Sequence, residues 1–157
     1  MTSRHRMNTR RPGGFTLIEI LVTLVMVAII AAMAVASYSG QVRKSRRVDA
    51  KTALLDLAGR EERNLSATNA YSTVAANLGY QGNFPMVVGS GYYQVTVAVP
   101  DPNQPAPAAG QPPTYALTAT PLGDQVNDTT CAVFTVNQLG QRTSVNNGGA
   151  DSTTSCW

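Results

Sequence analysis

The sequence predicts an α+β fold, in which one long amino-terminal helix packs against an antiparallel sheet of about four strands and the chain closes in a disulfide-bounded loop. Three observations support this prediction. An uninterrupted apolar segment covers residues 15–38, a helical pattern of apolar residues continues to residue 65, and short alternating segments follow residue 91. A helix followed by several strands is typical of a helix packed on one face of an antiparallel sheet.

The first half of the predicted helix has the length of a membrane span. Residues 15–38 contain a single charged side chain, Glu19, and as a helix they would extend about 36 Å, enough to cross a hydrocarbon core of about 30 Å. A secretory signal peptide usually has a shorter apolar region followed by a small-residue cleavage site, whereas here Gly13 and Gly14 precede the apolar segment. The apolar segment is therefore expected to be retained, with any processing ahead of it.

The second half of the predicted helix is amphipathic. No proline occurs between residues 41 and 65, and apolar side chains recur at helical spacing. We expect this face to be buried under the sheet and the whole helix to contain about 50 residues, roughly 75 Å. The face comprises Ala50, Ala53, Leu54, Leu57, Ala58 and Leu65.

The remaining chain predicts a small sheet domain. Residues 66–91 lack a sustained period and indicate a connecting loop with at most one short turn. Alternation of apolar side chains then predicts strands at residues 92–99, 115–120 and 131–137, and a tight turn leads to a short fourth strand at 142–145. Residues 66–157 would supply one modest core.

A proline-rich segment separates the first two predicted strands. Residues 100–113, from Pro100 to Pro113, contain six prolines, which cannot donate backbone hydrogen bonds to a sheet, so we expect an extended projecting loop. Its function could be an adhesive or partner-binding tip, or it could be a tolerated hairpin insertion. The insertion is favoured, because no aromatic or charged anchor other than Asp101 lies in the segment.

The two cysteines indicate the compartment. Cys131 and Cys156 form an even pair in a terminal region rich in Gly, Asn and Ser, which predicts a disulfide and an oxidising environment. Cations lie on both sides of the apolar segment, so charge alone does not orient it. The cysteines place the carboxy-terminal side in the periplasm and residues 1–14 in the cytoplasm.

The start of the chain resembles a known family. Residues 10–14 (RRPGG) followed by 15–19 (FTLIE) resemble the prepilin signature of type IV pilins and of type II secretion pseudopilins. The resemblance implies cleavage by a prepilin peptidase between Gly14 and Phe15 and N-methylation of Phe15. It also implies that Glu19 pairs with the free amine of a neighbouring subunit during assembly. The alternative for Glu19 is that its carboxylate only reaches the lipid headgroups.

Later segments extend the resemblance to PilE-like minor pilins. Residues 43–53, 128–131, 140–142 and 156–157 are similar to segments of those proteins. The resemblance divides the chain into a leader (1–14), a transmembrane and assembly segment (15–38) and a periplasmic head (39–157).

Removal of the leader would change the charge of the protein. The full chain has a formal charge of +3, but after residue 14 there remain eight cations against nine acids, a side-chain charge of −1. The cut would also remove His5, the only histidine, so the mature chain offers no histidine base or imidazole ligand. These counts argue against an enzyme and weaken the case for nucleic-acid binding from a basic pI.

The sequence offers two possible ligand-binding sites, one for DNA and one for calcium, and for each a simpler interpretation exists. Five cations within residues 43–51 could neutralise DNA phosphates. The favoured interpretation is that these cations contact anionic lipid or pair with nearby acids, because no aromatic residue interleaves with them. The acids are Asp49, Asp56, Glu61 and Glu62. Asp124, Asp128 and Asp151 could bind calcium with loop carbonyls, although their spacing matches no EF-hand and acids in turns commonly form Asx turns. We expect neither a metal nor another cofactor.

We therefore expect a structural subunit of a type IV pilus, a minor pilin. Its partners would be other pilin subunits, the prepilin peptidase, the inner-membrane pilus assembly machinery and the membrane before assembly. It would lie in the inner membrane of a Gram-negative-type bacterium and then in an extracellular pilus. A type II secretion pseudopilin, or a pilin that binds DNA or a surface, are the alternatives.

Overall fold

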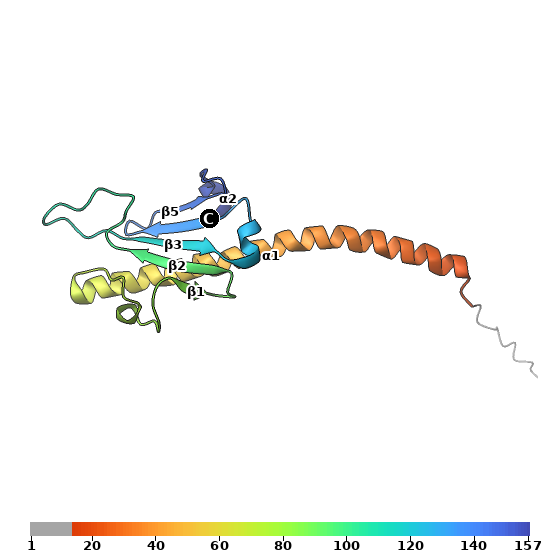
Figure 1. The fold of residues 1–157 in the computed structure, drawn as a ribbon, viewed down its shortest axis with the longest axis horizontal. Coiled ribbons are helices and arrows are strands. Elements are labelled where there is room, and N and C mark those ends of the chain that lie inside the picture. Colours follow the sequence, from red (N-terminus) through yellow and green to blue (C-terminus); the bar gives the residue numbers. More distant parts are fainter. Residues whose placement is uncertain (1–13) are drawn as a thin grey trace, which may run out of the picture. The chain divides into compact units, whose positions relative to one another are not determined.

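The computed structural model describes residues 14–157, apart from the side chains of residues 34–37. The predicted leader thus lies outside the described residues except for Gly14. Chain contacts divide the protein into one unit that ends at Ser39 and a second unit, Gly40–Trp157. The elements in order are α1 (Leu17–Thr68), the 3-10 turn η1 (Ala75–Leu78), β1 (Met86–Val88), β2 (Tyr93–Ala98), β3 (Ala116–Pro121), the 3-10 turn η2 (Gly123–Asn127), β4 (Val133–Asn137), β5 (Arg142–Val145) and α2 (Thr153–Cys156), as Figure 1 shows.

The first unit contains the apolar start of α1. Thr16 begins the helix, because its side-chain oxygen and its carbonyl oxygen both accept from the amide of Glu19, at 3.3 and 3.1 Å. The apolar side chains of this segment are exposed, among them Phe15 (78%) and Leu17 (84%). By its length and composition, α1 could cross a membrane.

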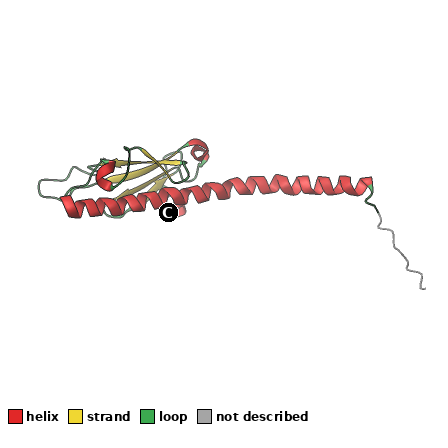
Figure 2. Ribbon diagram, turned by 90° about the horizontal axis from the view of Figure 1, so that it is seen from below, coloured by secondary structure: helices red, strands yellow, loops and turns green. Residues whose placement is uncertain are grey.

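The second unit is an antiparallel meander laid on the remainder of α1. The strands follow one another in the order β1-β2-β3-β4-β5, each antiparallel to its neighbour. Figure 2 shows the sheet lying over this part of the helix. Apolar side chains of alternate strand positions meet the helix, so the core forms between these two layers. The helix supplies Ala50, Leu54 and Leu57, and the sheet supplies Tyr93, Val95, Leu117, Ala119, Phe134 and Val136.

These elements confirm the predicted α+β class and correct its details. The predicted amphipathic face is right at Ala50, Leu54 and Leu57, which are buried. The helix continues to Thr68. The segment predicted as a loop with one short turn contains that turn, η1, and in addition a fifth strand, β1. β1 has only three residues, too few to show an alternating pattern, and it forms because Val87 pairs with Gln94 of β2.

One ion pair joins the helix to the loop between η2 and β4. The guanidinium of Arg47 donates from Nε to Oδ2 of Asp128 at 2.6 Å and from Nη2 to Oδ1 at 2.7 Å. The same carboxylate accepts from Gln125 Nε2 at 3.0 Å and from the amides of Thr130 and Cys131, both at 3.3 Å. Five donors thus converge on one buried carboxylate, and charge-assisted bonds of this kind are the strong ones.

The predicted disulfide is present. Cys131 and Cys156 are bonded, with 5.8 Å between their Cα atoms and 25 residues of sequence separation. The bond ties α2 to the residues that lead into β4. Both cysteines are buried, so the end of the chain is held against the core rather than left free.

We expect Asp128→Asn to lower the free energy of unfolding by about 3 kcal/mol, because the Arg47 guanidinium would stay largely buried without an opposing charge. Denaturant unfolding of the full chain in detergent micelles, followed by Trp157 fluorescence, measures this loss. Asp124→Asn, which neutralises an exposed acid four residues earlier, is the matched control. An equal loss in both variants would contradict the role given to the ion pair.

Candidate functional site

Two cations and an indole ring from distant parts of the chain meet on the second unit. Lys51 comes from α1, Arg142 from the start of β5, and Trp157 follows α2. The Nζ of Lys51 lies 5.8 Å from the centre of the Trp157 ring, and the Cζ of Arg142 lies 5.6 Å from it. Both distances fall within the range of cation–π attraction. We call this group, Lys51, Arg142 and Trp157, the tryptophan edge.

Local structure holds the indole in place. Cys156, which directly precedes Trp157, is fastened by the disulfide. The Trp157 Nε1 donates to the carbonyl oxygen of Thr143 at 2.7 Å, and the ring meets Phe134 edge to face, with 5.7 Å between ring centres. One hydrogen bond, one ring contact and the anchored neighbouring residue therefore hold the ring in place, and a fixed aromatic ring loses little conformational entropy on binding.

The positive charges of the tryptophan edge are not engaged in ion pairs in the part of the chain that the structure describes. Neither Lys51 nor Arg142 forms an ion pair with a carboxylate within residues 14–157. Arg142 is exposed and Lys51 is half-buried. Burial, and secondarily the positive charge of Arg47, lower the pKa of Lys51. An anion placed here would compensate both effects, so the edge is suited to bind phosphate or another anionic group.

Sequence reasoning missed this group. It found the cations of residues 43–51 but no aromatic residue among them, because Trp157 is distant in sequence and reaches Lys51 only through the fold. The same stretch does not form one basic surface. The Cζ of Arg46 lies 3.4 Å from the centre of the Tyr92 ring, and Arg47 forms an ion pair with Asp128.

The acids considered as partners of that stretch bond elsewhere. Asp49 accepts from the amide and the hydroxyl of Ser90, and Asp56 pairs with Arg60 at 2.8 Å. Glu62 accepts from the Tyr71 hydroxyl at 3.0 Å. Glu61 is fully buried and accepts from the amide of Ser72, and its burial raises its pKa.

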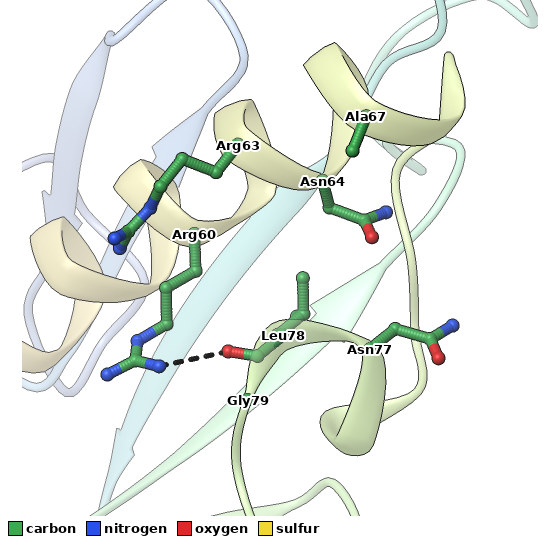
Figure 3. Close-up of a pocket in the computed structure, with 7 residues that line it drawn as sticks. All are labelled: Arg60, Arg63, Asn64, Ala67, Asn77, Leu78 and Gly79. Carbon is green, nitrogen blue, oxygen red and sulfur yellow. Dashed lines mark hydrogen bonds between the residues drawn. The ribbon is translucent and has the colours of Figure 1, made fainter.

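A second basic group lines a cavity of about 310 Å³ beside the end of α1, shown in Figure 3. Its two arginines are already engaged by the protein. Arg60 bonds to Asp56 and donates to the carbonyl oxygen of Leu78 at 3.0 Å, while Arg63 donates to the carbonyl oxygen of Gly59. The hydrogen bond from the Tyr80 hydroxyl has the largest effect on the pKa of Asp56 and lowers it, and Arg60 lowers it further. The bond from Arg60 to Leu78 joins the helix to η1. The two arginines of this cavity are therefore less available to a ligand than the cations of the tryptophan edge.

The other predicted site residues are placed as follows. Gly14 and Phe15 precede α1, and Glu19 lies exposed in its first turn. Of the three acids considered for calcium, Asp128 bonds to Arg47 and Asp151 accepts from the amide and the hydroxyl of Thr153, at 3.0 and 2.6 Å. Within residues 14–157, no group of three His, Cys, Asp or Glu side chains lies together in a way that could hold a metal ion.

Comparisons with known proteins cover both units. Residues 36–135 match the family model described as type IV minor pilin ComP, DNA uptake sequence receptor, and residues 9–35 match the prokaryotic N-terminal methylation motif. Comparison with individual curated proteins gives no significant match. A solved type IV pilin from Shewanella oneidensis is similar over 73% of this chain and 97% of its own, with 23% identity and a TM-score of 0.46. Because the first model matches well over half of the chain, this protein belongs to the type IV minor pilin family.

Proposed function

We propose that this pilus subunit binds DNA through the tryptophan edge. The observation that carries the proposal is the meeting of two unpaired cations with a fixed indole ring. The description of the matching family as a DNA uptake sequence receptor supports the choice of ligand.

The electrostatics favour a local contact over general attraction to nucleic acid. After residue 14 the side chains carry a formal charge of −1, so the protein as a whole does not draw DNA toward it. Phosphates would have to contact particular cations. Lys51 and Arg142 form no ion pair within the described residues, so a phosphate that binds them breaks none. Arg47 and Arg60, by contrast, would first have to leave Asp128 and Asp56.

The indole has a supporting role in this proposal. Its N–H donates a hydrogen bond to the carbonyl oxygen of Thr143, and its ring packs against Phe134. The indole is therefore held in place and positions the two cations. DNA would then be held mainly by its phosphates, and binding would depend steeply on salt.

The location and processing of the chain are part of the same proposal. The apolar segment of α1 would hold the protein in the inner membrane with its head in the periplasm, where the disulfide is stable. The prepilin peptidase would cut between Gly14 and Phe15, and the assembly machinery would insert the subunit among other pilins in an extracellular pilus. The methylation motif at residues 9–35 supports cleavage and methylation there.

Glu19 would guide this assembly. A carboxylate in a membrane-spanning helix costs on the order of 2–3 kcal/mol, so it gains from a cationic partner. The amine of Phe15 in a neighbouring subunit would provide that charge once the leader is removed.

The Arg142→Gln variant tests the DNA site. We expect it to weaken binding of a labelled DNA duplex and to lower the slope of log affinity against log salt by about one, the loss of one phosphate contact. Fluorescence anisotropy of the full chain in detergent over a range of salt concentrations measures both. Lys51→Gln should act in the same direction.

Arg63→Gln is the matched control, because it removes the same charge from an exposed position on α1. It should leave both values nearly unchanged. Equal weakening by Arg63→Gln and Arg142→Gln would show that only net charge matters.

A bulky residue at Gly14 tests the processing site. We expect Gly14→Leu to block cleavage, because a side chain would hinder the extended backbone in a narrow protease site. Electrophoresis of membrane fractions would show the longer uncut chain. Thr16→Val, two residues beyond the cut, should still be processed, and normal processing of Gly14→Leu would refute the assigned site.

Glu19→Ala separates processing from assembly. The cut should occur normally, but less of the protein should appear in pili sheared from cells, because the pairing with the Phe15 amine is lost. Immunoblots of sheared fibres and of membranes measure the two fractions. Glu19→Asp, which keeps the charge, should restore part of the incorporation, and wild-type incorporation of Glu19→Ala would disprove the pairing.

A further inference from the structure

The face of the sheet opposite α1 carries a row of threonines. Thr96, Thr118, Thr135 and Thr143 are cross-strand neighbours on β2, β3, β4 and β5. Adjacent strands lie about 4.8 Å apart, so the row presents hydroxyl groups at a regular spacing. Each threonine alternates with a side chain that points into the core, which places the row on the outer face.

This row has unused hydrogen-bonding capacity. The Thr96 hydroxyl reaches only the Thr118 carbonyl oxygen, at a long 3.4 Å. The hydroxyls of Thr118, Thr135 and Thr143 have no hydrogen-bond partner within residues 14–157. A hydroxyl both donates and accepts, so such a row suits a ligand that also does both.

A cavity of about 220 Å³ opens at the β4–β5 end of the row. Thr135 and Thr143 line it from the sheet, and Asp101, Asn103 and Gln104 line it from the first residues of the proline-rich loop. Figure 1 shows this loop projecting past the end of the sheet. Sites for drug-sized ligands measure roughly 300–1,000 Å³, so this cavity fits a smaller group, about one sugar ring.

The wall contributed by the loop is held rigidly. Asp101 is 4% exposed, and its carboxylate accepts from the amide of Asn103 at 2.8 Å and from Gln104 Nε2 at 2.6 Å. Its own amide donates to the Thr114 hydroxyl at 3.1 Å, and Gln138 Nε2 donates to Gln104 Oε1 at 3.1 Å. A wall fixed in advance loses little entropy when a ligand binds.

The lining selects against the ligand proposed for the tryptophan edge. Among the described residues, no cation lines the cavity, and the charged group that does so is the Asp101 carboxylate, which repels phosphate. Gln141 also lines it, and only its Oε1 is engaged, by Asn137 Nδ2 at 2.8 Å, which leaves the Nε2 free to donate. Hydroxyls and amides without a cation together match a neutral molecule with several hydroxyl groups.

We propose that this cavity, between the β4–β5 face and the base of the proline-rich loop, binds a neutral sugar unit of a glycan. The Gln141 amide and the hydroxyls of Thr135 and Thr143 bind one ring, while Asp101 holds the loop wall in place. The threonine row continues under the next units toward β2. The site is independent of the proposed DNA contact, because Trp157 packs on Phe134, whose side chain lies on the opposite face of the sheet.

Titration of the full chain with disaccharides tests this site. The chain is held in dodecylphosphocholine, whose headgroup is not a sugar, and cellobiose, chitobiose, lactose and maltose are added separately while calorimetry records binding. We expect at least one to bind with a dissociation constant of about 1 mM or lower. Thr135→Val combined with Thr143→Val should weaken that binding about tenfold, through the loss of two hydrogen bonds.

Thr118→Val is the matched control, because it removes a hydroxyl of the same row outside the cavity. It should reduce binding of a disaccharide less than Thr135→Val or Thr143→Val does alone, and a DNA duplex should not displace the sugar. The proposal is overturned if none of the four sugars binds, if Thr118→Val weakens binding as much as each of these single variants, or if DNA competes. Absence of sugar binding would leave the expected effect of Arg142→Gln on DNA binding unchanged, so failure of one proposal is distinguishable from failure of the other.

Discussion

The ion pair between Arg47 and Asp128 is the interaction on which the rest of the head depends. It connects α1 to the loop before β4 through two short charge-assisted bonds. The same carboxylate orders the amides of Thr130 and Cys131, and so it places the first cysteine of the disulfide. Gln125 extends the network to the hydroxyl of Tyr93 in the core. Buried charges are costly unless they are paired and hydrogen-bonded, and here each bond also positions a segment with a further role.

The tryptophan edge is a consequence of this arrangement. Asp128 orders Cys131, the disulfide holds Cys156, and the next residue, Trp157, meets Lys51 one turn along α1 from Arg47. The ion pair and the edge thus share one helix surface. Arg47 is neutralised and structural, whereas Lys51 remains uncompensated and feels the positive charge of Arg47. A stretch of cations that looks uniform in the sequence therefore separates into residues that hold the fold and residues that remain available to a ligand.

Family membership decides between the alternatives left by the signature of residues 10–19. That signature is shared by pilins and secretion pseudopilins, and the match over residues 36–135 identifies a minor pilin of a type IV pilus. It also indicates a structural protein that assembles with other pilins. The exposed apolar side chains from Phe15 to Met33 fit this description, because a membrane or neighbouring helices would cover them.

The sequence by itself determined the long helix, its buried face, most of the sheet, the disulfide and the family, because these depend on local periodicity and on motifs within short segments. It did not determine β1, which exists only through its pairing with β2. Nor could it show that Arg47 pairs with Asp128, or that Trp157 lies near both Lys51 and Arg142, since these residues are more than 80 positions apart or lie on separate elements. Only the tertiary structure decided those contacts, because they arise where the helix, the sheet and the end of the chain pack together, and no local pattern encodes that meeting.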